Sequence, residues 1–324
     1  MKTSNFQYNR DGLRNKLAAS PAQTVQAFVG RPATVLFCDV HKPTKKTLID
    51  VAFLVSRARE ILGKSLEMVY SSESRLHRLT FGMKVVRGEK CRGDSQHIRL
   101  ADQKEVADTW QFYFLTVAKW LTHFEEFQRL EQEVQLQILQ CVWHIWATLD
   151  RHVATAIHRR NHPTAPKTEI VSRRGVIIDV ASVRFDSSWL SDYPSAQIAY
   201  FLRQHSHENF DIIGVLGELE PTDVELTYML AQLCFEYAGK RYQGEILKAM
   251  ERFQEVLADD LHNYYVNERM LPVYLDRLAK MMRVNNAIQK NLWEHRPRME
   301  LAKLFNIVKI EFSHPEMFKD SGFN

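Results

Sequence analysis

The sequence contains few of the residues that interrupt helices and few cysteines. Only 12 glycines and 10 prolines occur among its 324 residues, so long segments can remain helical. The four cysteines, Cys38, Cys91, Cys141 and Cys234, lie far apart and form no C-x-x-C pair, which argues against a zinc knuckle or a dithiol redox site. Isolated cysteines of this kind are typical of a protein from a reducing compartment.

The sequence also shows no pattern of a signal peptide or of a membrane span. The first residues, MKTSNFQYNRDG, contain no apolar core. Lys119, His144 and Arg151 interrupt the most hydrophobic stretches before about 18 apolar residues accumulate. Charge is nearly balanced, with 43 Lys and Arg against 39 Asp and Glu and a net charge of +4. We therefore expect no membrane segment, and charge alone does not predict nucleic-acid binding.

Motifs of the common enzyme classes are missing as well. The sequence has no Walker loop, no dinucleotide-binding glycine fingerprint, no G-x-S-x-G and no H-E-x-x-H. His152, His158 and His162 stand near one another in the sequence, but no carboxylate has the spacing of a further metal ligand. We therefore expect this chain to be neither an enzyme nor a metal protein.

Apolar residues recur at three- and four-residue spacing over most of the chain, which predicts an all-α protein. The helix over 131–160 carries apolar residues on several faces, which indicates a helix at the centre of the protein. Another expected helix begins at Asp108 as N-cap, and the last long one is expected to break near Pro297. The expected helices cover 47–62, 108–124, 131–160, 193–202, 221–239, 245–265 and about 270–308.

Two segments depart from this helical pattern. Residues 169–186 are rich in β-branched side chains and contain Arg174-Gly175, which predicts one short β-hairpin. Residues 71–104 are polar, mixed in charge and contain glycine, which predicts a long loop or insertion.

The C-terminal residues predict a short helix over about 313–320. Ser313 and Glu316 have the spacing of a capping box, and Met317 and Phe318 form an apolar side. An isolated helix below about 12 residues is mostly unformed in water. We therefore expect this segment to be ordered only when docked, which would make it a two-state element.

The segment WLTHFEEFQRLEQEVQLQILQCVWHIW resembles the signature of the ligand-binding domain of nuclear hormone receptors. In that signature a tryptophan helix is followed by F-x-x-L, a glutamine, two aliphatic residues and a tryptophan. The matching positions are Trp120, Phe124, Phe127, Leu130, Gln135, Ile138, Leu139 and Trp143. The segments AFVGRPATVLFCDV, LIDVAFLVSRAREIL and FSHPEMFKDSGF are similar to the expanded nematode branch of the family, which is thought to derive from a hepatocyte-nuclear-factor type ancestor.

The resemblance implies a three-layer helical sandwich with one small β-hairpin. SNFQYNRDGL is similar to the segment after the second zinc module of the family's DNA-binding domain. Residues 1–44 are then a hinge with the tail of that domain, and 45–324 form the ligand-binding domain with a C-terminal activation helix. The resemblance also implies a ligand-regulated transcription factor located in the nucleus. Zinc and DNA would be bound only by the DNA-binding domain, outside this chain.

The resemblance further implies a ligand pocket between the tryptophan helix, the central helix and the long C-terminal helix. Its expected lining is Trp110, Tyr113, Phe114, Val117, His144, Thr148 and Arg151. The aromatic and aliphatic members can equally be plain core residues. A fatty acid or another apolar molecule is the expected ligand. Arg151 distinguishes a ligand pocket from a plain core. A guanidinium there needs a ligand carboxylate, a protein acid such as Glu169 or Asp179, or solvent.

A coregulator groove and a dimer face are implied in the same way. In the family, a coregulator helix binds between a lysine at the end of the tryptophan helix and a glutamate on the last helix. The groove positions are Lys119, Thr122, Gln135, Leu139, Glu316, Met317 and Phe318. The homodimer face is expected at Leu271, Tyr274, Leu278, Met281 and Met282, although this stripe can equally pack internally.

Two departures from the family pattern favour an alternative. Thr122 stands where the family has its lysine, with Lys119 one turn earlier, and Ser313-His314 replace an expected apolar pair. The alternative is a constitutive, ligand-independent dimerisation and protein-interaction module. Its pocket would be filled by the protein's own bulky side chains, Trp110, Phe114, Trp143 and Trp146.

Overall fold

The computed structural model describes residues 46–64, 74–88, 96–195, 198, 201 and 206–321. All of them belong to one compact unit, Val40–Asn324. The expected hinge over 1–44 lies outside the described residues, as does half of the expected helix over 193–202. None of the described helices is long and apolar enough to cross a membrane.

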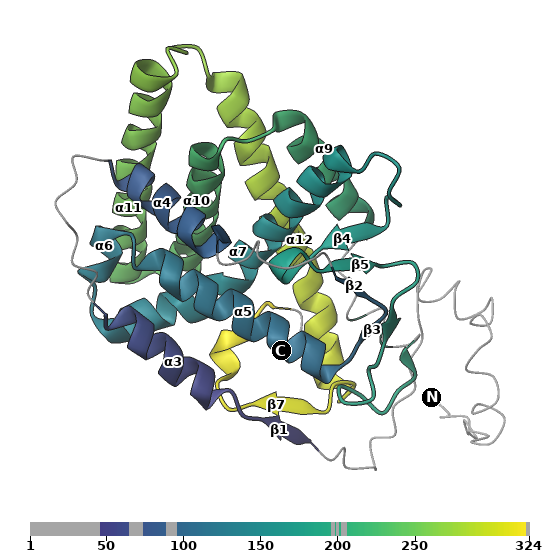
Figure 1. The fold of residues 1–324 in the computed structure, drawn as a ribbon. Coiled ribbons are helices and arrows are strands. Elements are labelled where there is room, and N and C mark those ends of the chain that lie inside the picture. The colour runs from purple at the N-terminus through teal and green to yellow at the C-terminus, as the bar shows by residue number, and fades with distance from the viewer. Residues whose placement is uncertain are drawn as a thin grey trace, which may run out of the picture. The chain divides into compact units, whose positions relative to one another are not determined.

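The described residues are mainly helical, which confirms the predicted fold class (Figure 1). The helices are α3 (Ala52–Leu62), α4 (Arg75–Gly88), α5 (Gln103–Leu121), α6 (Glu125–Gln128), α7 (Gln132–Asn161), α9 (Ser206–Leu219), α10 (Asp223–Tyr242), α11 (Gly244–Asn263) and α12 (Leu275–Leu304). A π-helical turn, Tyr264–Glu268, follows α11, and single 3-10 turns cover Arg173–Gly175 and Pro315–Met317.

Helix α7 is the centre of the sandwich, as its apolar residues on several faces predicted. Helices α3, α5, α9, α10 and α12 all pack against it. Ile138, Trp146 and Leu149 have no solvent exposure, and α7 ends at Asn161, one residue beyond the predicted end. A helix buried on all sides must offer its polar groups to neighbouring elements, to its own backbone or to an internal cavity, which matters for the site described below.

The predicted start of α5 at Asp108 is wrong. The helix begins at Gln103, because Asp102 is the N-cap and its carboxylate accepts a hydrogen bond from the Glu105 backbone N–H at 2.9 Å. Asp108 lies inside the helix, with its carboxylate 3.7 Å from the Arg173 guanidinium. An acidic residue nearly two turns further along the chain therefore gave a false start signal.

The predicted loop over 71–104 is also wrong, because α4 occupies Arg75–Gly88. Leu76, Leu79, Met83 and Val86 are all buried, and their spacing of three, four and three residues is helical. A Cβ atom on Gly82 would lie only 2.5 Å from the His123 ring. The glycine therefore serves close helix packing rather than a turn.

Helices α10 and α12 begin and end differently from the sequence expectation. The capping box at Thr222 and Glu225 is present, but α10 runs three residues beyond Gly239, which instead lies against Leu247. Helix α12 begins at Leu275 and continues through Pro297. Because Pro297 is exposed, the carbonyl group that loses its helical hydrogen bond can be solvated.

The predicted hairpin is confirmed, and further short strands accompany it. Strands β4 (Glu169–Val171) and β5 (Ile177–Asp179) pair antiparallel. The sequence analysis missed three parallel pairs: β2 (His97–Ile98) with β5, β3 (Leu100–Ala101) with β6 (Arg184–Phe185), and β1 (Thr47–Ile49) with β7 (Ile310–Phe312). Strands of two or three residues are too short to show alternation in a sequence.

The predicted C-terminal helix is reduced to the 3-10 turn Pro315–Met317, and its expected capping box is absent. The Ser313 hydroxyl accepts a hydrogen bond from the Val51 N–H at 2.9 Å instead, while the Glu316 carboxylate pairs with Arg241 at 2.6 Å. Both polar groups are thus used for contacts with distant parts of the chain rather than for the turn itself.

Gln135 holds the connection between α6 and α7. Its side-chain amide donates hydrogen bonds to the backbone oxygens of Phe127, Gln128 and Leu130, at 3.2, 3.0 and 2.9 Å.

Gln135→Ala should lower the free energy of unfolding by about 1–3 kcal/mol, because buried carbonyl groups lose their partner. Gln140→Ala, on a half-buried position of the same helix, is the control and should change it by less than about 0.5 kcal/mol. Urea unfolding measures both, and equal effects would contradict this role.

Candidate ligand pocket and C-terminal segment

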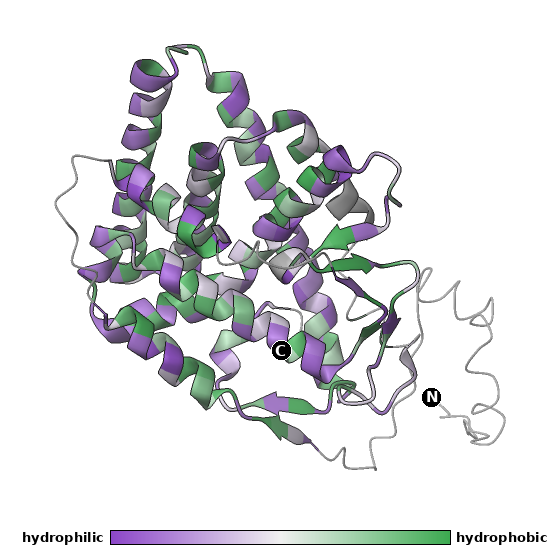
Figure 2. Ribbon diagram, viewed as in Figure 1, coloured by the Kyte–Doolittle hydropathy of each residue, from purple (hydrophilic) through white to green (hydrophobic). Residues whose placement is uncertain are grey.

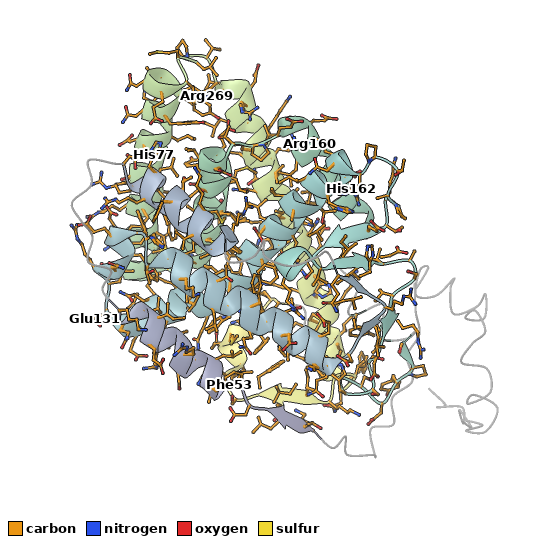
Figure 3. The ribbon with its side chains drawn as sticks, in the orientation of Figure 1. Phe53, His77, Glu131, Arg160, His162 and Arg269 are labelled. Carbon is orange, nitrogen blue, oxygen red and sulfur yellow. The ribbon has the colours of Figure 1, made fainter. Side chains whose placement is uncertain are left out.

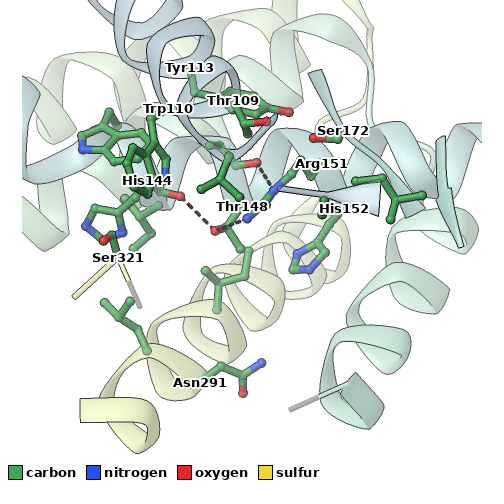
Figure 4. Close-up of a pocket in the computed structure, with 18 of the residues that line it drawn as sticks. Thr109, Trp110, Tyr113, His144, Thr148, Arg151, His152, Ser172, Asn291 and Ser321 are labelled. Carbon is green, nitrogen blue, oxygen red and sulfur yellow. Dashed lines mark hydrogen bonds between the residues drawn. The ribbon is translucent and has the colours of Figure 1, made fainter. Parts of the chain in front are cut away.

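A cavity of about 210 Å³ lies where α5, α7 and α12 meet (Figure 4). Its wall is mostly apolar, and the polar lining residues come from α7 and also from α5, α12 and the segments around Ser172 and Ser321. The lining residues are Ala101, Glu105, Val106, Thr109, Trp110, Tyr113, Trp143, His144, Ile145, Ala147, Thr148, Arg151, His152, Ser172, Ile178, Ile288, Asn291, Leu292 and Ser321. A concave, mostly apolar space with some polar groups is the usual form of a small-molecule site.

Five of the seven pocket residues expected from the sequence line this cavity. They are Trp110, Tyr113, His144, Thr148 and Arg151. The other two, Phe114 and Val117, do not line it and are completely buried in the core. The sequence analysis missed His152, which lines the cavity eight residues after His144. Positions i, i+4 and i+8 share one helix face, so extending the spacing from His144 and Thr148 would have found it.

Arg151 brings a positive charge to the pocket without a carboxylate partner among the described residues. Its Nε donates to the Ala147 carbonyl of its own helix at 3.3 Å, and one terminal nitrogen donates to Thr148 Oγ1 at 3.4 Å (Figure 4). The acids considered as partners are engaged elsewhere. Glu169 contacts His158 at 3.0 Å, and Asp179 accepts hydrogen bonds from its own turn. Two long bonds within one helix leave most of the guanidinium's donor capacity available.

His144 and His152 are neutral groups in the wall of the pocket. Burial lowers the pKa of His144 to about 4 and that of His152 to about 3. Their exposed fractions are 6% and 8%. His144 Nε2 and His152 Nδ1 have no hydrogen-bond partner among the described residues. Because buried polar atoms are normally paired, these nitrogens are available for a polar group of a bound molecule.

The C-terminal segment 310–321 closes one side of the pocket region. Phe318 is fully buried and stacks on Phe312, with ring centroids 3.7 Å apart. It also contacts the pocket residue Trp110 edge-on at 4.7 Å. The Trp143 indole donates a hydrogen bond to the Met317 backbone oxygen at 2.7 Å. Two pocket tryptophans therefore contact this segment directly.

A buried ion pair holds the end of the same segment. The Asp320 carboxylate accepts hydrogen bonds from the Arg296 guanidinium and from the Tyr237 hydroxyl, the latter at 2.6 Å. Burial alone would raise the pKa of Asp320, but these hydrogen bonds and the positive charge of Arg296 lower it below its ordinary value. Ser321, the next residue, lines the pocket, so the ion pair fixes one part of the pocket wall.

Residues 92–305 match the family described as the ligand-binding domain of nuclear hormone receptor. This chain belongs to the nuclear hormone receptor family. It is 42% identical to Caenorhabditis elegans nuclear hormone receptor family member nhr-115, over 100% of this chain and 82% of that protein. It is also 42% identical to nhr-90, over 100% of this chain and 81% of that protein, and 41% identical to nhr-130, over 93% and 69%.

The comparisons confirm the family and the nematode relationship that the signature indicated. Nuclear hormone receptors are transcription factors rather than enzymes, so the expectation of no catalytic activity agrees with the family. The α5–α7 segment that carries the signature also forms most of the pocket wall. The family assignment and the pocket therefore rest on the same part of the chain.

The seven coregulator positions of this nuclear hormone receptor do not form one open groove. Thr122, Gln135 and Leu139 are buried, and Met317 and Phe318 have no exposure. The Thr122 hydroxyl donates to the Lys119 backbone oxygen at 2.7 Å. Lys119 is half-buried, and Glu316 is exposed but pairs with Arg241. Their role in binding a coregulator stays a prediction.

The predicted dimer stripe packs largely within the chain. Met281 is fully buried, and Leu278 and Met282 are half-buried. Tyr274 stacks on Tyr265 with ring centroids 4.3 Å apart. Leu271 precedes α12 and is 45% exposed. The internal alternative therefore accounts for most of this stripe, and dimerisation through it stays a prediction.

The neutral pocket histidines predict a loss of stability in acid. An unfolded histidine takes up a proton near pH 6.5, whereas these two remain neutral in the folded chain to about pH 4 and 3. Because the unfolded state binds more protons than the folded state in this pH range, the unfolded population rises as pH falls. We expect the free energy of unfolding to fall from about pH 6.5 toward pH 4, by up to about 1.4 kcal/mol per pH unit for each histidine.

Urea unfolding as a function of pH measures this dependence. His152→Gln should make the profile less steep, while His162→Gln, which replaces an exposed histidine, should leave it unchanged. A profile with the same slope in the His152 and His162 variants would contradict a neutral, buried His152.

Proposed function

We propose that this chain is the ligand-sensing part of a nuclear transcription regulator, and that its pocket binds a compact, largely apolar carboxylic acid. The observation that carries the proposal is the Arg151 guanidinium in the pocket wall, held only by two long bonds within α7. Arginine and carboxylate form paired, charge-assisted hydrogen bonds. His144 Nε2 and His152 Nδ1 supply further polar positions.

The size of the cavity narrows the ligand class. Small-molecule pockets usually measure about 300–1,000 Å³, whereas this one measures about 210 Å³. A short, branched or aromatic acid suits this space better than the long-chain fatty acid expected from the family's ancestral type. Trp110 and Ile145 would contact its apolar part, and Arg151 its carboxylate.

The ligand would act on the C-terminal segment through residues that the two share. Trp110 lines the pocket and contacts Phe318, while Ser321 lines the pocket beside the Asp320 ion pair. A ligand that contacts both would stabilise the docked position of segment 310–321 relative to an undocked one. In this proposal ligand binding raises the fraction of molecules in which segment 310–321 is docked, and this change is the signal of the receptor.

The family membership supports three further proposals about partners. The domain recruits helical coregulators, pairs with a second copy of the chain, and acts on DNA through a DNA-binding domain outside these residues. Nuclear hormone receptors typically work in the nucleus, and we propose that location here. These activities would be modulated by the pocket and by the C-terminal segment.

A second candidate is the constitutive interaction module, and the packing around the pocket favours it. Trp110, Trp143 and Phe318 form aromatic contacts beside a small cavity. If the protein's own side chains supply all the packing that a ligand would give, segment 310–321 stays docked without one. The two candidates differ in whether any acid stabilises the folded chain.

Thermal unfolding with a panel of carboxylic acids and their uncharged amides tests the proposed ligand class. An acid at a hundred times its Kd should stabilise the fold by about 2.7 kcal/mol, which raises Tm by about 5 °C. The matching amide should have a much smaller effect. Arg151→Met should weaken acid binding by about tenfold to hundredfold, because a charge-assisted pair is lost.

Arg160→Met is the matched control, since Arg160 lies near the end of the same helix and pairs with Glu220 away from the pocket. This variant should bind the acid as the unaltered chain does. If no acid in the panel raises Tm, the constitutive candidate replaces the proposal. If acids and amides act equally, or Arg151→Met keeps full affinity, the assignment to Arg151 is wrong.

A further inference from the structure

Helix α3 is a short amphipathic helix that docks by one face. Figure 1 shows it beside α5, with its first residues next to the β1–β7 pair. Hydrophobic and hydrophilic residues alternate along its ribbon in Figure 2. Its buried residues follow helical spacing: Val51, Leu54, Val55, Ala58 and Leu62. On the outer face, Phe53 is 60% exposed and projects from the edge of the ribbon (Figure 3).

The first turn of α3 is held by the C-terminal segment. The Val51 N–H donates a hydrogen bond to Ser313 Oγ at 2.9 Å, and the Ser313 N–H donates to the Ile49 carbonyl at 3.1 Å. A free N–H at a helix start requires an acceptor. Ser313 supplies the acceptor for Val51, the N-cap residue, while the nearby Asp50 carboxylate accepts the Ala52 N–H at 2.8 Å.

The last turn of α3 is held by the first turn of α7. Gln132 Nε2 donates to the Arg59 carbonyl at 3.1 Å, and the Arg59 guanidinium donates two hydrogen bonds to the Glu133 carboxylate. The Arg59 carbonyl also accepts the Gly63 N–H at 2.9 Å, so Gln132 adds a second donor. The body of the domain therefore adds one acceptor next to the start of α3 and one donor at its end, and α5 and α7 pack between them.

This arrangement is that of a helix bound in a groove. We propose that the surface of α5 and α7 under α3 is the site for a partner protein's amphipathic helix, and that α3 occupies this site from within the same chain. The partner helix carries apolar residues at positions i, i+3, i+4 and i+7, as α3 does. The proposal rests on the proposed recruitment of helical coregulators and is independent of the acid ligand.

The length and the ion pair of α3 suit an exchangeable helix, and its buried face packs into the main hydrophobic core. It has 11 residues, a length at which an isolated helix is marginal in water. Its buried face contains no aromatic side chain, and its Arg59–Glu133 pair is exposed, at 44% and 68% of the side chains. An exposed ion pair adds little to stability. Helix α10, in contrast, has buried residues around most of its circumference.

The full chain with Leu54→Asp and Ala58→Asp tests the proposal, because two carboxylates on the buried face oppose docking of α3. The probe is a fluorescently labelled peptide of residues 46–64, and its anisotropy reports binding. We expect the peptide to bind this variant at least tenfold more tightly than the unaltered chain, whose site is filled. A peptide that carries the same two substitutions should not bind.

Phe53→Asp in the full chain is the matched control, since it places a carboxylate on the outer face of α3, and this variant should bind the peptide as weakly as the unaltered chain. Equal binding to all chains would overturn the proposal. So would a double variant that unfolds at the usual temperature yet fails to bind the peptide. Loss of the acid-induced rise in Tm would instead count against the ligand proposal alone.

Hydrogen exchange on the unaltered chain gives a second test that does not depend on a folded double variant. Amides of α3 should exchange at least tenfold faster than those of α10, because α3 opens locally. Excess unlabelled 46–64 peptide should speed their exchange further by competing for the site. The pair of substitutions Gln132→Ala and Ser313→Ala, which removes one side-chain contact at each end, should also raise the α3 rate. Exchange of α3 as slow as that of α10 would overturn the proposal.

Discussion

Burial of α7 on all sides is the constraint on which the pocket depends. The polar side chains in its buried stretch need a protected space or a partner, which a neighbouring element supplies for Asp150 and Thr155. His144, Thr148, Arg151 and His152 share that space. Charge inside an apolar core is costly unless it is paired. The pocket therefore contains the buried polar groups that are costly in free energy, and the same groups allow it to bind a ligand selectively.

The C-terminal segment 310–321 connects the pocket to other parts of the domain through its contacts. Its aromatic side chains contact pocket tryptophans, its Asp320 pairs with Arg296 of α12, and its Ser313 accepts the N–H of Val51, the residue before α3. Any shift of segment 310–321 therefore alters three neighbours together. The proposed ligand and the proposed helical partner act on opposite parts of this one segment, so their effects are physically connected.

Local sequence patterns predicted the central features well. Helical spacing identified α7, and the family signature assigned five residues that line the cavity. Features that depend on distant partners were missed or wrong. Ser313 has the spacing of a cap, but Val51 supplies a competing donor. Gly82 resembles a loop residue, but it lies where the His123 ring leaves no room for a side chain. Sequence periodicity contains no information about such long-range neighbours.

The parallel pair of β1 and β7 has a consequence for synthesis of the chain. Val51 and the serine that accepts its hydrogen bond are separated by 262 residues. During translation the ribosome must therefore add nearly the whole domain before β1 meets its partner strand. The helices between them can form earlier, since their contacts are more local. The β1–β7 pair can therefore form only after residue 312 has been synthesised, and a chain that ends before β7 lacks it.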